Sequence, residues 1–129
     1  MRIGVPKEIK AQESRVGLTP DSTKVLISNG HEVLVEDNSG FESGFDNDQY
    51  KKAGATIVTQ AIDIFNDSEI IVKVKEPLNS EIKMIKENQI VFTYLHLAAA
   101  KELTDGLIKS KSICIAYETV TDNNGKLPL

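Results

Sequence analysis

Short apolar runs rich in β-branched residues alternate along this chain with longer segments that have a helical pattern, and turn-forming residues separate them. The clearest runs are residues 69–75 (EIIVKVK) and 90–95 (IVFTYL). Such alternation is typical of a parallel sheet whose strands are joined by crossover helices. The pattern therefore predicts an α/β fold, with three αβα layers around a mostly parallel sheet.

Individual elements follow from the same pattern and from their boundary residues. Strands are predicted at 2–6, 31–36, 55–58, 69–75, 90–95 and 112–118. Helices are predicted at 20–29, 46–52, 59–66, 80–87 and 98–109. The first helix has the strongest signals, because Thr19 suits an N-cap, Pro20 suits the first helical position and Gly30 suits the stop.

Length and composition limit the classes of protein to consider. The chain has 129 residues, 40% of them hydrophobic, which is the size of one domain. Its net charge of -4, without a basic cluster, argues against nucleic-acid binding. No apolar run approaches the 18 residues of a membrane span, and the single Cys114 excludes an internal disulfide. We therefore expect a cytoplasmic protein that binds neither nucleic acid nor membrane.

Several cofactor motifs are missing. The eight glycines form no Gly-x-Gly pair, so the Rossmann-like or flavodoxin-like domain we expect lacks a dinucleotide fingerprint. A phosphate loop is also missing, and His31, His96 and Cys114 have no metal-ligand spacing. We expect no NAD, ATP or metal ion on this segment.

Four polar residues fall where the predicted strands end: Arg15, Lys75, His96 and Glu118. In open α/β sheets, ligands bind outside the carboxyl ends of the strands. A guanidinium and an ammonium suit a small carboxylate, and histidine is the usual proton carrier near neutral pH. The pattern therefore predicts a carboxylic-acid site in which Arg15 and Lys75 bind the substrate and His96 is catalytic, with Glu118 a weaker candidate.

Each of these residues also has a purely structural interpretation. Arg15 could form a surface ion pair, since Glu8 and Glu13 are near in sequence. Lys75 alternates with Lys73 on one strand face, and lysines near strand ends often protect a sheet edge. His96 could be a hydrogen-bonded histidine without a chemical role. The pattern alone leaves both interpretations open.

The end of the chain predicts a missing partner. A parallel sheet is normally covered on both faces, yet no helix follows the last predicted strand. We expect a continuation of the chain or another subunit to cover that face. The alternative is an exposed tail.

Four segments resemble the alanine dehydrogenases, in the right order along essentially all of the chain. They are residues 1–20 (MRIGVPKEIKAQESRVGLTP), 73–77 (KVKEP), 93–98 (TYLHLA) and 116–120 (AYETV). The resemblance implies that residues 1–129 are the N-terminal part of a catalytic, substrate-binding domain. In that family the chain continues into an NAD-binding domain, which is absent here, and the subunits form homo-oligomers such as hexamers.

The resemblance also implies an activity: reversible, NAD-dependent oxidative deamination of L-alanine to pyruvate and ammonium. Arg15 then clamps the substrate carboxylate, Lys75 bonds the carboxylate or carbonyl oxygen, and His96 acts as acid or base. The family's acidic catalytic partner and its glycine-rich loop lie in the missing domain. The isolated segment should therefore be inactive.

Other functions remain open at this point. The first domain of the nicotinamide nucleotide transhydrogenase alpha subunit has a similar opening, but its chemistry does not use the lysine and histidine found here as Lys75 and His96. A stand-alone carboxylate-binding or structural module belongs to a different class. A relative of saccharopine dehydrogenase is a more distant alternative.

Overall fold

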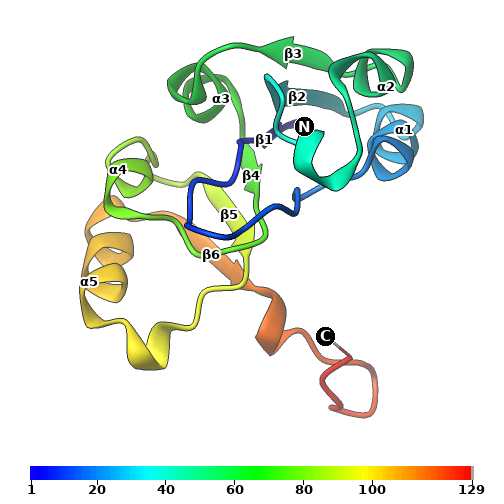
Figure 1. Cartoon of the computed structure of the whole chain (residues 1–129). Helices are drawn as coiled ribbons and strands as arrows, with labels where there is room; N and C mark the ends of the chain where they lie inside the picture. The colour runs from blue at the N-terminus through cyan, green and yellow to red at the C-terminus, as the bar shows by residue number, and fades with distance from the viewer. Residues whose placement is uncertain (129) are drawn as a thin grey trace.

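The computed structural model describes residues 1–128 and contains one six-stranded sheet (Figure 1). Its order is β3-β2-β1-β4-β5-β6, and every neighbouring pair is parallel. This is the strand order of the Rossmann fold, so the predicted fold class is confirmed. The strands are β1 (Arg2–Val5), β2 (Glu32–Glu36), β3 (Thr56–Val58), β4 (Ile70–Val72), β5 (Ile90–Thr93) and β6 (Ile113–Ala116).

The helices largely follow the sequence prediction. They are α1 (Pro20–Ser28), α2 (Asn47–Lys52), α3 (Ala61–Asp67), α4 (Asn79–Ile82) and α5 (Lys101–Ser110), with short 3-10 turns at Phe41–Ser43, Leu97–Ala99 and Tyr117–Thr119. Thr19 caps α1 as predicted, because its side chain accepts a hydrogen bond from Ser22 N. Gly30 follows α1 with φ +82°, a conformation that favours glycine.

Two predicted elements are wrong in extent. The predicted helix 80–87 is a single turn, α4, after which further turns bring Ile85 into the core. The predicted strand 69–75 ends as β4 at Val72, although Lys73 N still donates to Phe92 O of β5. The backbone then bends at Val74 and Lys75, although Tyr94 N still donates to Val74 O at 3.3 Å.

The helices cover the sheet in two layers. On one face, α1 and α2 pack on β1 to β3 around residues such as Val5, Val35 and Tyr50. On the other face, α3, α4 and α5 pack around Phe65 and Val91. These are the three predicted αβα layers.

The strand order reverses between β1 and β4, which lie side by side although they are far apart in sequence. The loop 6–19 after β1 and the segment 73–78 after β4 therefore leave the same edge of the sheet next to each other. This is the topological switch point, where ligands bind in open α/β sheets. Among residues 1–128, no helix has both the length and the apolar character needed to cross a membrane.

Candidate functional site

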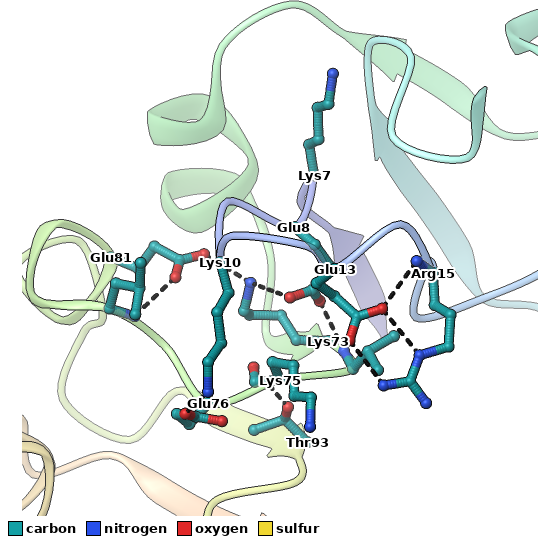
Figure 2. A network of polar contacts seen from close by, with 12 residues as sticks. Lys7, Glu8, Lys10, Glu13, Arg15, Lys73, Lys75, Glu76, Glu81 and Thr93 are labelled. Atoms are coloured by element: carbon teal, nitrogen blue, oxygen red, sulfur yellow. Dashed lines mark hydrogen bonds and ion pairs between the residues drawn. The ribbon is translucent and has the colours of Figure 1, made fainter. Parts of the chain in front are cut away.

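Arg15 lies in the loop after β1 and is bound to Glu13 (Figure 2). Its Nε and Nη2 donate to the two oxygens of Glu13 at 2.8 and 2.7 Å, and its backbone N donates to Glu13 Oε1 at 2.9 Å. The ion pair expected under the structural interpretation is thus present. Nη1 has no hydrogen bond to any residue of the described chain, and the Arg15 side chain is 60% exposed. One edge of the guanidinium is therefore held by protein and the other faces solvent.

Lys75 lies in the segment after β4, close to the same pair. Its positive charge contributes, after that of Arg15, to holding the pKa of Glu13 down. Figure 2 shows its side chain close to Glu13 in this view. Its backbone carbonyl accepts a hydrogen bond from Thr93 Oγ1 at 2.9 Å. Since β4 is a central strand, edge protection does not explain Lys75.

Behind this pair lies a buried cluster that the sequence reasoning missed. Lys73 Nζ contacts Glu8 Oε2 at 3.2 Å and Glu81 Oε1 at 2.7 Å. The three side chains are only 1%, 2% and 3% exposed, respectively. In the sequence, Lys73 was noted only as a neighbour of Lys75 on one strand face, and its burial was not predicted. A lysine inside the apolar run 69–75 was the available signal, because a charge on a central strand needs a buried partner.

His96 follows β5 in an unusual backbone conformation. Its φ of 51° lies in the left-handed region, which residues other than glycine seldom adopt and which often marks functional sites. The carboxylate of Glu118 holds this turn by accepting hydrogen bonds from Leu95 N and His96 N. The imidazole stacks on Tyr94 with ring centres 6.0 Å apart and planes at 10°. Within residues 1–128 its ring nitrogens have no hydrogen bond, so the structural interpretation finds no support there.

Arg15 and His96 line two different clefts, and Lys75 is among the lining residues of neither. Arg15, Tyr94 and Tyr117 line one cleft of about 440 Å³, and Lys73 and Val74 form part of its wall. His96 and Glu118 line a second cleft. Tyr94 connects the two, because its ring stacks on His96 and packs edge-on against Tyr117 at 5.0 Å. The structure thus brings Arg15 and Lys75 together around Glu13 and places His96 one aromatic ring away.

Charge and burial adjust the protonation of the site. Hydrogen bonds from Arg15 lower the pKa of Glu13 to about 2, so this carboxylate is charged at all ordinary pH values. Burial, aided by the nearby Glu8 charge, raises the pKa of Tyr117 to about 12, so its phenol stays protonated. Burial raises the pKa of Glu118, but hydrogen bonds from His96 N and neighbouring backbone N–H groups outweigh it and leave this pKa lowered. The site thus presents cationic and hydroxyl donors, which suit a small carboxylate.

Comparison with known proteins gives a consistent family. The family described as Alanine dehydrogenase/PNT, N-terminal domain matches residues 4–129. An alanine dehydrogenase of Staphylococcus epidermidis (strain ATCC 35984) is 52% identical over 129 residues, which is 100% of this chain and 34% of that protein. An alanine dehydrogenase of Staphylococcus haemolyticus (strain JCSC1435) is 50% identical over the same shares. This chain spans about a third of the length of these curated relatives.

Solved structures agree. An L-alanine dehydrogenase superposes with a TM-score of 0.96 at 50% identity, covering 99% of this chain and 35% of that one. A transhydrogenase from Sinorhizobium meliloti superposes with a TM-score of 0.89 at 25% identity, covering 96% of this chain and 35% of that one. From its sequence and its fold, the chain belongs to the alanine dehydrogenase/PNT N-terminal domain family.

Proposed function

We propose that this chain is the N-terminal part of the substrate-binding domain of an alanine dehydrogenase. The whole protein would catalyse the reversible, NAD-dependent oxidative deamination of L-alanine to pyruvate and ammonium. The observation that carries this proposal is that the loop with Arg15 and the segment with Lys75 leave the sheet side by side at its switch point, where both cations act on Glu13 beside the Arg15 cleft. Identity of 50% to an L-alanine dehydrogenase, against 25% to a transhydrogenase, favours this activity over the alternative.

The roles of the side chains follow from their contacts. The substrate carboxylate would take the free edge of the Arg15 guanidinium, because Glu13 already occupies Nε and one hydrogen of Nη2. Lys75 would bind the carboxylate or the C2 oxygen and stabilise the charge that develops there. His96 would carry the proton at the reacting centre, on the far side of Tyr94.

NAD is proposed to bind outside the residues described here. In dinucleotide-binding folds the pyrophosphate lies on a tight glycine turn at the start of the first helix. Here the start of α1 follows the long loop 6–19, is capped by Thr19 and carries Asp21 in its first turn. A carboxylate at this position opposes a phosphate, so these residues do not fit the cofactor.

A further part of the protein is proposed to complete this domain. The α1 and α2 layer covers β1 to β3, but on the same face of β6 the side chains of Ile113 and Ile115 are 50% and 42% exposed. A sheet of this type buries both faces. The rest of the polypeptide would cover these side chains, and the whole protein would assemble as a homo-oligomer such as a hexamer. With Cys114 as a free thiol, the cytoplasm is the compartment we propose.

The test is an assay of the whole protein. Oxidation of NADH that requires both pyruvate and ammonium is expected, and the isolated 1–129 segment should show none. Transfer of reducing equivalents between two nicotinamide nucleotides, without use of pyruvate, would instead support the transhydrogenase alternative and overturn the proposal. A titration of the isotopically labelled segment with pyruvate, followed by amide NMR, would then show whether shifts cluster around Arg15, Lys75 and His96.

A further inference from the structure

Glu8, Lys73 and Glu81 form a buried cluster, which Figure 2 draws beside Arg15 and Lys75. It joins three segments: the loop after β1, the end of β4 and the turn α4. Lys73 also forms part of the wall of the Arg15 cleft. No step of the proposed function uses this cluster.

Each glutamate of the cluster uses one oxygen for Lys73 and the other for the backbone. Glu8 Oε1 accepts from Val74 N at 2.7 Å, and Glu81 Oε2 accepts from Leu78 N at 2.8 Å. These two backbone groups lie on either side of Lys75. A single ammonium group thus gathers the two carboxylates that hold the segment 74–78 in place.

The loop that carries Arg15 is fixed by the same cluster. Glu8 belongs to this loop and reaches across to β4, a contact between residues 65 positions apart in sequence. The next residues of the loop lead to Glu13 and Arg15. The cluster therefore ties the loop that carries Arg15 to the segment that carries Lys75.

Stability is a poor explanation for such a cluster. The free energy needed to remove three charged groups from water can exceed the free energy gained from the two ion pairs that they form. Apolar residues of similar volume often stabilise a protein more. Here two carboxylates share one cation, and burial raises the pKa of Glu8 despite the opposing effect of Lys73. What the cluster offers over an apolar core is a defined geometry.

We propose that Lys73 is a positioning residue that, through Glu8 and Glu81, sets the relative placement of Arg15 and Lys75 for the substrate carboxylate. This inference rests on the proposed function. Since the Lys73 side chain is only 1% exposed, it would act through the two glutamates and not on the substrate directly.

The decisive variant is a neutral replacement of the whole cluster in the whole protein, Glu8→Gln with Lys73→Met and Glu81→Gln. Both glutamines keep an oxygen that can accept from the backbone, so the fold should persist. The KM for pyruvate should rise by about 10- to 100-fold, while the KM for NADH stays unchanged. The matched control neutralises the exposed pair of α5, Lys101→Met with Asp105→Asn, and should leave both constants unchanged.

Two further measurements keep the test independent of folding and of activity. If the triple variant does not fold, the single variant Glu81→Gln takes its place. It leaves Lys73 paired with the carboxylate of Glu8, and the one amide oxygen at position 81 must then accept from both Leu78 N and Lys73. A smaller rise in the KM for pyruvate is expected. A crystal structure of the folded variant should show a changed separation of Arg15 and Lys75. An unchanged KM for pyruvate with unchanged placement of both residues would overturn the inference. If the wild-type protein does not turn over pyruvate, the proposed function fails, and the crystal structure still decides the positioning role.

Discussion

Glu8 and Glu13 belong to the same loop and both side chains are largely shielded from solvent, but Glu8 binds a buried cation and Glu13 binds an exposed one. Glu8 is buried against Lys73, and burial raises its pKa. Glu13 meets Arg15 at the edge of the cleft, and the hydrogen bonds from Arg15 lower its pKa to about 2. The comparison teaches that one loop can use the same residue type for two purposes. Glu8 joins the loop to the sheet, and Glu13 holds the exposed guanidinium of Arg15 at the cleft.

The largest effect is expected from Lys73→Met alone. This change leaves the carboxylates of Glu8 and Glu81 buried without a cation, which should lower the free energy of unfolding by about 3–5 kcal/mol. Chemical denaturation of the whole protein measures it. Lys101→Met, which breaks the exposed pair with Asp105, should cost less than about 1 kcal/mol. Equal losses in the two variants would show that the buried cluster is no different from a surface pair.

Arg15→Ala should affect binding far more than stability. Hydrogen bonds to charged groups contribute about 1.5–3 kcal/mol each, so the KM for pyruvate should rise about 10- to 150-fold. Steady-state kinetics and thermal unfolding of the same samples separate the two effects. Arg2→Ala removes the other arginine of the chain, which pairs with Glu32 on the surface, and serves as the control. A large loss of stability in Arg15→Ala would show that Arg15, like the buried cluster, acts mainly in holding the structure together.

Thr93→Val tests a smaller support of the same segment. Thr93 is fully buried and its hydroxyl donates to the carbonyl of Lys75, so its loss should cost about 1 kcal/mol of stability. Thr119→Val removes a similar hydrogen bond at an exposed turn and should cost less. Thermal unfolding compares the two. A negligible loss in Thr93→Val would indicate that this hydrogen bond adds little to the other contacts that hold the segment.

The dependence of stability on pH should have opposite signs for the two glutamates. The pKa of Glu13 is lowered, so its contribution is complete above the ordinary value of 4.5 and is lost as the pH falls toward about 2. The pKa of Glu8 is raised, so its contribution is present below 4.5 and is lost as the pH rises through the higher value. Thermal unfolding should be measured as a function of pH. Glu13→Gln should remove the loss of stability at low pH, and Glu8→Gln should remove the loss of stability above pH 4.5. If Glu13→Gln instead removed the loss of stability above pH 4.5, or Glu8→Gln removed the loss at low pH, the two pKa shifts would be assigned to the wrong glutamates.

Local patterns were enough to predict most of the fold. Apolar runs with turn residues between them placed all six strands, and the cap at Thr19 placed the start of α1. The helix predicted at 80–87 failed for a physical reason. After α4 the backbone hydrogen bonds become those of tighter turns, from Met84 N to Glu81 O and from Ile85 N to Ile82 O, and these turns carry Ile85 into the core.

What the sequence determined by itself is the strands, the helices and the polar residues that follow the strands, because these depend on neighbours within a few positions. The switch point came only from the tertiary structure, because it depends on the pairing of β1 with β4, which are far apart in sequence. The pairing of Arg15 with Glu13, two residues away, is equally local. Tertiary structure alone decided that Lys73 is buried, since its partner Glu8 is 65 positions away and only the pairing of β1 with β4 brings them together. A charge inside an apolar run can be predicted to need a partner, but which partner it finds depends on the fold.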